Sequence, residues 1–286
     1  YPLMNLSVAV DDHLLGMTHV IRGKDHIANT RRQEFIFRYM GWKPPVYRHY
    51  GRMGIEGVVL STSQMRAGIQ SGEYSGWDDV RLGTLRAMAR RGIKPGAVRN
   101  AVVEIGIGET DIQFSWENLY AKNKEIIDAG ADRFFFVPDP VLVPVSGSGP
   151  MIAEAMRYPG DESRGYRSIP FDGSVYLPGS ELTSGTPFLR LKDLFNIRVF
   201  YDGDNIRAEY AGDDLQEARS KKAPIIQWLS KEHAHPCTLK SPDGDINGVC
   251  EPEAVSEKDR IVQFERVGFA RIDKIGEDAV AYFTHR

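Results

Sequence analysis

The sequence predicts a chain of unlike parts: an α/β unit that runs into a helical segment, followed by an antiparallel β-barrel or sandwich. Three observations predict this. The chain has 286 residues, enough for about two domains of ordinary size. Apolar residues recur mainly at helical spacing before residue 140. After residue 140, short alternating runs are separated by turn residues.

Four helices are expected in the first part, each opened by a capping residue or a proline. Their expected ranges are 25–41, 79–92, 95–105 and 115–130. The first helix should bury an apolar stripe made of Ile27, Phe35, Ile36, Tyr39 and Met40. Two short strands are expected nearby, over 6–10 and 16–21.

The second part predicts strands without intervening helices, which is typical of an antiparallel barrel or sandwich. The expected strands are 173–177, 196–201, 206–210, 225–229, 261–264 and 279–284. Asp-Gly pairs at 172–173, 202–203 and 243–244 mark turns between them.

The composition excludes several classes of protein. A net charge of −3 with 42% apolar and 26% charged residues excludes a disordered acidic or basic tail. No window approaches the roughly 18 consecutive apolar residues of a membrane span, and no signal peptide is visible. Two cysteines cannot build a disulfide framework, so we expect a reducing, cytoplasmic setting.

Positive charge is concentrated near the start of the chain. Residues 22–99 carry fifteen Lys or Arg against six acids, a local charge of +9, whereas residues 141–286 sum to −5. Such a cluster is more often a solvated surface. However, twelve of the fifteen are Arg, whose guanidinium fork suits phosphate oxygens and so favours a polyanionic partner.

Three short motifs leave more than one interpretation open. The loop Leu60-Ser61-Thr62-Ser63 follows an apolar run and can present hydroxyl and N–H groups to a phosphate, although a plain surface turn is the commoner case. The segment 76–81 reads as a helix start capped by its acids. The segment 262–268 is either a salt-bridged rim or a ligand contact.

A zinc site is not expected. His233, His235, Cys237 and Cys250 lack the paired Cys-x-x-Cys spacing of structural zinc sites. No Ser/His/Asp nucleophile arrangement can be assigned from the chain either.

Several motifs in order along the chain resemble the glutamyl/glutaminyl branch of class I aminoacyl-tRNA synthetases, in particular its archaeal-type glutamyl enzymes. The matching segments are 1–5, 16–22, 60–63, 76–81, 90–92, 226–228, 233–236 and 263–268. Each motif is weak alone, but the ordered set covers essentially the whole chain.

The resemblance implies a three-part layout. Residues 1–60 resemble the C-terminal half of a Rossmann-type catalytic domain that ends in the mobile ATP loop known as KMSKS. Residues 61–140 resemble the helical segment that contacts the tRNA stem. Residues 141–286 resemble the β-barrels that bind the anticodon.

The implied reaction is ATP-dependent attachment of glutamate to tRNA through glutamyl-adenylate. ATP with Mg²⁺ enters as substrate, no structural metal is expected, and the partners are glutamate and the acceptor stem and anticodon of tRNA. Neither DNA nor a membrane is an expected partner. Two other interpretations are a tRNA-binding module alone and a glutaminyl relative.

The resemblance also assigns roles near the start of the chain. Tyr1 and Asn5 match positions that line the amino-acid pocket, and Arg22 matches the position that faces the substrate's side-chain carboxylate in glutamyl enzymes. An Arg left unpaired against a neutral amide should cost roughly 1–3 kcal/mol, so glutamate is favoured over glutamine. Arg52 resembles an ATP-contacting position, and Leu60, Ser61, Thr62 and Ser63 form the KMSKS-like loop.

In the β-rich part, Arg167, Gln263 and Arg266 match positions that read the anticodon. Arginine reading a base edge is the expected chemistry there.

Two features depart from the family pattern. Thr62 stands where many relatives carry a Lys, for which Arg66 is a candidate substitute. No His-Ile-Gly-His element is present. We therefore expect the chain to be a C-terminal portion that lacks the first half of the catalytic domain and cannot activate glutamate alone.

Overall fold

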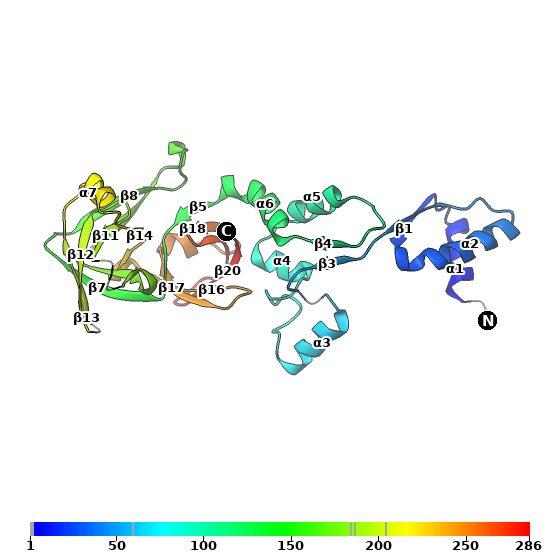
Figure 1. The fold of residues 1–286 in the computed structure, drawn as a ribbon, viewed down its shortest axis with the longest axis horizontal. Coiled ribbons are helices and arrows are strands. Elements are labelled where there is room, and N and C mark those ends of the chain that lie inside the picture. Colours follow the sequence, from blue (N-terminus) through cyan, green and yellow to red (C-terminus); the bar gives the residue numbers. More distant parts are fainter. Residues whose placement is uncertain (1–2, 59, 184, 186, 204) are drawn as a thin grey trace.

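The computed structural model describes residues 3–286 except 59, 184, 186 and 204. Its parts follow one another along an elongated molecule (Figure 1). The N-terminal helices lie at one end and a β-barrel-like sheet lies at the other. The C-terminal strands and the helical segment lie between them.

The N-terminal unit alternates helix and strand. It consists of α1 Met4–Leu14, β1 His19–Gly23, the 3-10 turn η1 Lys24–His26, α2 Ile27–Tyr39 and β2 Val46–Tyr50. The two strands pair in parallel, with Arg22 opposite His49. The α/β character of this region was predicted, but the strand expected over 6–10 is wrong because these residues lie inside α1. Alternation over only five residues does not separate one helical turn from a strand.

Helix α2 buries a different face from the one predicted. Phe35, Tyr39 and Met40 are at least half exposed. The buried side chains of α2 are Thr30, Gln33 and Phe37. Polar groups at the spacing i, i+3 thus share the buried face with one aromatic ring, whereas of the predicted apolar stripe only Ile27 and Ile36 are half-buried.

The helical segment follows. Its elements are β3 Met53–Ile55, α3 Thr62–Ser71, α4 Leu85–Arg91, α5 Pro95–Ile105, β4 Ile112–Phe114, α6 Trp116–Ile127 and the 3-10 turn η2 Asp128–Gly130. Two predicted helix starts are confirmed. Pro95 occupies the first turn of α5. The Ser115 hydroxyl accepts a hydrogen bond from the Asn118 N–H at 3.3 Å.

The helix predicted over 79–92 begins later, at Leu85. Thr84 caps it by accepting from the Ala87 N–H at 3.0 Å. Asp79 instead accepts from Arg81 Nε and Nη2 at 2.9 and 2.7 Å. These bonds hold the pKa of the Asp79 carboxyl well below its usual range despite burial. The acid therefore fixes the turn before the helix rather than the helix start.

We name the sheet at the far end of the molecule, together with its hairpin, the first barrel. In the part of the chain that the structure describes, this sheet has seven strands in the order β14-β11-β12-β13-β7-β10-β15. Their bounds are β7 Pro140–Ser146, β10 Ser174–Pro178, β11 Phe188–Leu191, β12 Asn196–Asp202, β13 Asn205–Tyr210, β14 Ile225–Ile226 and β15 Leu229–Ser230. The hairpin β8 Met151–Met156 and β9 Tyr166–Phe171, the 3-10 turns η3 Glu162–Arg164 and η4 Gly179–Glu181, and the helix α7 Leu215–Ser220 complete it. Most pairs are antiparallel as predicted, but β13–β7 and β11–β14 are parallel. The strand expected over 225–229 is split in two.

The second barrel is a seven-stranded sheet in the order β5-β18-β19-β20-β16-β17-β6. Its bounds are β5 Asp132–Phe134, β6 Phe136–Pro138, β16 His235–Lys240, β17 Ile246–Cys250, β18 Ile261–Phe264, β19 Gly268–Lys274 and β20 Ala279–His285, with the 3-10 turns η5 Lys231–His233 and η6 Pro252–Val255. The two edge strands, β5 and β6, are consecutive in the chain and joined by Phe135 alone. The sheet therefore curls until both edges reach the same segment, and the β-rich part begins before residue 140.

Three consecutive phenylalanines join the two barrels. Phe134 and Phe136 lie in the core of the second barrel, whereas Phe135 lies in the core of the first. Successive side chains of an extended segment point to opposite sides, so one segment serves both cores. All three rings are 1% exposed or less.

Arg91, at the end of α4, connects the helical segment to the last strand. Its guanidinium donates to the carbonyls of Phe283 and Thr284 at 3.2 and 2.8 Å and to the Tyr120 hydroxyl at 2.8 Å. The Thr284 hydroxyl returns a hydrogen bond to the Arg91 carbonyl. Arg91 is only 4% exposed, so these bonds replace its hydration.

We expect Arg91→Met to lower the free energy of unfolding by about 3 kcal/mol, because two buried carbonyls and a hydroxyl lose a charged donor. The measurement is urea unfolding of the chain followed by circular dichroism. Arg86→Met is the matched control, since Arg86 is exposed on the same helix, and it should change the value by less than about 0.5 kcal/mol. Equal effects of the two substitutions would contradict this role of Arg91.

Candidate functional site

A layer of polar side chains lies between α2 and the β1–β2 sheet. Arg22 of β1 stands at its centre, with its guanidinium 4.9 Å from the centre of the Tyr47 ring. Its Nη2 donates to the Thr30 hydroxyl and to Gln33 Oε1, the latter at 2.8 Å. Thr30 also lies 2.9 Å from His49 Nε2. The guanidinium is thus oriented by groups from both the helix and the sheet.

Asn5 and Arg22, both predicted to line an amino-acid pocket, belong to one network. Gln33 Nε2 donates to Asn5 Oδ1 at 3.3 Å, while Gln33 Oε1 accepts from Arg22. Asn5 Nδ2 in turn donates to Asn29 Oδ1 at 3.4 Å. Tyr1, the third predicted pocket residue, lies outside the described residues.

Three buried polar atoms near Arg22 have no hydrogen-bond partner among the described residues. They are Arg22 Nε, Asp12 Oδ2 and the Tyr47 hydroxyl. Burial raises the pKa of the Asp12 carboxyl, and the charge of Arg22 opposes that shift. Burial likewise raises the pKa of Tyr47. A buried donor or acceptor without a partner costs free energy, so this cluster is suited to a polar ligand.

The spacing of the helix could have identified part of this layer. Thr30, Gln33 and Phe37 share one face of α2 at i, i+3 and i+7. This pattern was overlooked because it is mostly polar, and sequence reasoning followed the more apolar stripe. Asp12 and Tyr47 carry no comparable signal, since only the packing of α1 and β2 brings them near Arg22.

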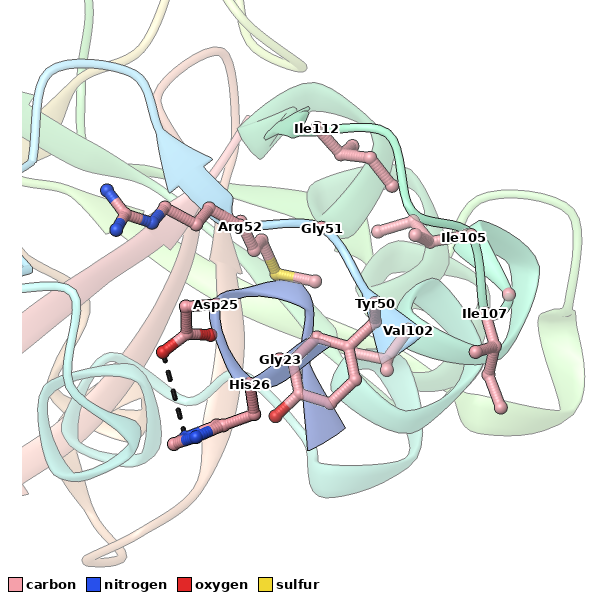
Figure 2. Close-up of a pocket in the computed structure, with 13 residues that line it drawn as sticks. Gly23, Asp25, His26, Tyr50, Gly51, Arg52, Val102, Ile105, Ile107 and Ile112 are labelled. Atoms are coloured by element: carbon pink, nitrogen blue, oxygen red, sulfur yellow. Dashed lines mark ion pairs between the residues drawn. The ribbon is translucent and has the colours of Figure 1, made fainter. Parts of the chain in front are cut away.

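Arg52 lies in the connection between the N-terminal unit and the helical segment. Its backbone N–H donates to Asp111 Oδ1 at 2.6 Å. It lines a pocket of about 630 Å³ with an apolar wall that includes Val102, Ile105 and Ile112. Figure 2 shows the Arg52 side chain extending away from this wall, and the ion pair of Asp25 and His26 (3.7 Å) at the opposite side. The pocket offers an apolar surface close to Arg52.

The predicted loop leads directly into α3. Leu60, Ser61, Thr62 and Ser63 are all exposed. Ser61 is the N-cap residue, but its side chain makes no capping hydrogen bond and lies 3.0 Å from the Ser63 hydroxyl. The first N–H groups of α3 are thus open to an anionic ligand, which a helix N-terminus favours. Leu60 and Arg52 line one further pocket, of about 440 Å³.

At the junction of the two barrels, Arg167 is buried and fully oriented by protein groups. Its Nε donates to both oxygens of Glu251 at 2.9 Å, its Nη1 to the Met156 carbonyl at 2.6 Å, and its Nη2 to Glu265 Oε1 at 2.9 Å. Its side chain is 1% exposed. In this arrangement it holds the junction together, and its reading of an anticodon base stays a prediction.

Gln263 and Arg266 lie close to this junction in the β18–β19 hairpin. Gln263 is half-buried opposite Phe269. Arg266 adopts a φ of 62°, in the left-handed region, and its side chain is 55% exposed. Its Nη1 donates to the Ile225 carbonyl at 2.7 Å. Of the three predicted anticodon residues, Arg266 thus presents the most accessible charge, and its role also stays a prediction.

Glu265 forms ion pairs, as one of the two interpretations left open for segment 262–268 predicts, whereas a ligand contact by Gln263 and Arg266 stays a prediction. Besides accepting from Arg167, it lies 2.9 Å from Lys192 Nζ. Its carbonyl accepts from Gln227 Nε2 at 2.6 Å. Sequence reasoning missed Lys192 and Glu251, whose partners are distant in the chain, and it gave no role to Gln227 of the matching segment 226–228.

Most of the basic side chains in residues 22–99 are exposed. The basic residues of 22–99 that are exposed and make no ion pair among the described residues are Arg31, Arg32, Arg38, Lys43, Arg48, Arg52, Arg66, Arg86 and Arg99. By contrast, Arg81 and Arg90 pair with Asp79 and Asp78 at 2.7 Å. The surface interpretation of the cluster therefore holds for most of its members, and their charge is available to a polyanion.

Within the described ranges, no group of three or more His, Cys, Asp or Glu side chains is arranged to hold a metal ion. No helix in the described part of the chain is long and apolar enough to cross a bilayer.

Three family models match the chain in succession. Residues 1–129 match the catalytic domain of the class I tRNA synthetases (E and Q). Residues 131–211 and 225–273 match two anticodon-binding domains of the same group. The first break falls at the end of η2, where the helical segment gives way to the barrels.

Curated relatives agree with these models. The chain is 86% identical over 286 residues to a glutamate–tRNA ligase of Methanospirillum hungatei, covering all of this chain and 51% of the relative. It is 63% identical over 287 residues to the same enzyme of Methanoculleus marisnigri, again covering all of this chain and 51% of the relative. The chain thus spans about half the length of these relatives. A crystal structure of a glutamate tRNA ligase from Elizabethkingia meningosepticum covers 45% of this chain and 31% of its own at 20% identity, but its TM-score of 0.34 is too low to inform the fold.

The pH dependence of stability tests the barrel junction. Burial raises the pKa of Glu251 from 4.5 to about 7, although Arg167 opposes the shift. The folded state therefore holds this proton more tightly than the unfolded state. The resulting stabilisation is present below pH 4.5 and is lost as pH rises through about 7.

We expect Glu251→Gln to abolish this pH-dependent loss. Between pH 4.5 and 7, the free energy of unfolding of the variant should therefore rise by up to about 3 kcal/mol relative to that of the unmodified chain. Urea unfolding at half-unit pH steps measures it. Glu253→Gln changes an exposed glutamate two residues away. The difference in free energy of unfolding between this variant and the unmodified chain should stay nearly constant with pH. A constant difference for Glu251→Gln as well would contradict the raised pKa.

Proposed function

Because the chain belongs to the glutamyl/glutaminyl class I tRNA synthetases, we propose that it is part of a glutamate–tRNA ligase. In the parent protein, the α-carboxylate of glutamate would attack the α-phosphate of ATP, forming glutamyl-adenylate and releasing pyrophosphate. The terminal ribose of tRNA would then take the glutamyl group and release AMP. Such catalysis relies on positioning and on electrostatic stabilisation of the phosphate rather than on a protein nucleophile.

The observation that carries this proposal is the oriented guanidinium of Arg22. Two acceptors fix its Nη2, and its buried Nε has no partner among the described residues. An unpaired, partly buried cation favours an anionic ligand group over a neutral one. In this role Arg22 would receive the side-chain carboxylate of glutamate and disfavour the amide of glutamine, which argues against a glutaminyl enzyme.

For ATP, with Mg²⁺ as part of the substrate, we assign Arg52 and the loop Leu60-Ser61-Thr62-Ser63. The uncapped start of α3 and the hydroxyls of Ser61 and Ser63 support phosphate binding there. Arg66, exposed one turn into α3, is the nearest candidate for the charge that Thr62 does not supply.

For tRNA, we assign the exposed arginines of the first part to the acceptor stem, and Arg167, Gln263 and Arg266 to the anticodon. The division into 1–60, 61–140 and 141–286, with a Rossmann-type half and a stem-contacting helical segment, is part of this proposal. A protein of this kind would act in the cytoplasm, where tRNA is charged.

Arg22→Ala in the full-length protein should raise the KM for glutamate by about 10- to 100-fold, because a charged contact to the substrate is lost. ATP–pyrophosphate exchange in the presence of tRNA measures it. Arg219→Ala, at an exposed arginine of α7 that has no assigned role, is the matched control and should leave this KM unchanged. Exchange that depends on glutamine and not on glutamate would contradict the proposed function.

Arg266→Ala should weaken tRNA binding and reduce the slope of log Kd against log salt concentration by about 1, because an exposed cation that contacts RNA releases counterions. Filter binding at two or more salt concentrations measures it. Arg207→Ala, on the 60% exposed arginine that pairs with Glu209, is the control. An unchanged affinity and slope for Arg266→Ala would contradict its assignment to the tRNA surface.

A further inference from the structure

Gln33 is a buried residue of α2 whose side-chain amide links α1 to β1 within the layer of polar side chains around Arg22. It is 0% exposed. Its carbonyl oxygen accepts from Arg22 Nη2 at 2.8 Å, and its amide nitrogen donates to Asn5 Oδ1 at 3.3 Å. One side chain of α2 therefore fixes a residue of β1 and a residue of α1.

Its neighbour Thr30 completes the restraint on the guanidinium. The Thr30 hydroxyl accepts from the same Nη2, and Thr30 is 6% exposed. A guanidinium has five N–H donors, two of them on Nη2. Thr30 and Gln33 thus occupy both Nη2 donors, and the donors on Nε and Nη1 have no hydrogen-bond partner among the described residues.

Neutrality of the two acceptors is as important as their position. A hydroxyl and an amide hold the guanidinium without cancelling its charge, whereas a carboxylate at either position would form an internal ion pair. Asp12 interacts with Arg22 through space, and no hydrogen bond joins the two side chains among the described residues. The positive charge therefore stays available to a ligand.

We propose that Gln33, assisted by Thr30, is a positioning residue that keeps Arg22 both fixed in direction and uncompensated in charge, and so sets the preference for a carboxylate over an amide. This inference rests on the proposed function, in which Arg22 faces the substrate's side chain. It adds two residues of α2 that do not themselves touch the substrate.

The direct test is Gln33→Glu in the full-length protein, compared with Gln33→Leu. Glutamate at position 33 would neutralise Arg22, so the KM for glutamate should rise at least about tenfold and the ratio of kcat/KM for glutamate over glutamine should fall by a similar factor. Leucine would loosen Arg22 but leave its charge. We expect Gln33→Leu to raise the KM for glutamate by about 3- to 10-fold while most of that ratio is retained.

The readouts separate positioning from general damage to the fold. Both variants should keep the KM for ATP and the kcat at saturating glutamate within about threefold, since partial unfolding would lower kcat without changing selectivity. Gln70→Glu adds the same charge at an exposed glutamine of α3 and should change none of these values. If Gln33→Glu does not fold, Thr30→Val removes the other acceptor and should raise the KM for glutamate in the same way.

The outcomes distinguish this inference from the proposed function. If the unmodified protein uses glutamate and Arg22→Ala loses it, but Gln33→Glu and Thr30→Val keep the normal KM and selectivity, the inference fails and the proposed function stands. If the unmodified full-length protein shows no glutamate-dependent exchange, the proposed function fails. A loss of selectivity with Gln33→Glu but not with Gln33→Leu supports the inference.

Discussion

The constraint on which the β-rich half depends is that one extended segment must serve two cores at once. Phe134 and Phe136 fill the second barrel, and Phe135 between them fills the first. Backbone polar groups around this segment are satisfied by side chains, since the Phe135 N–H is donated to Glu251 at 2.5 Å and the Phe136 N–H to Gln227 at 3.2 Å. Residues that orient the junction therefore also fix the relative position of the two barrels.

Side-chain hydrogen bonds also fix the packing at the other end of the molecule. There, a layer of polar side chains replaces an apolar core between α2 and the sheet, and its hydrogen bonds leave one guanidinium directed but incompletely paired. Buried polar layers of this kind are costly unless nearly every group is satisfied. The few unsatisfied atoms around Arg22 are therefore the part of the N-terminal unit best explained by a ligand.

Much of this organisation could be predicted from the sequence, because it depends on local signals. Pro95 and Ser115 start helices as their chemistry requires, and the strand over 261–264 has the predicted limits. The failures have physical reasons too. A strand was expected over residues 6–10 of α1 because five residues are too few to distinguish helical from alternating spacing. The polar face of α2 was missed because its burial depends on partners in α1, β1 and β2. Glu251 and Arg167 are 84 residues apart, and no pattern in the sequence pairs them.

In the function proposed above, Arg22 receives the side-chain carboxylate of glutamate. A crystal structure of the full-length protein with a non-hydrolysable glutamyl-adenylate analogue tests it most directly. We expect this carboxylate to lie within about 3 Å of Arg22 Nη1 or Nε, with Nη2 still bound to Thr30 and Gln33. A carboxylate bound elsewhere, with Arg22 paired to a protein acid, would contradict it.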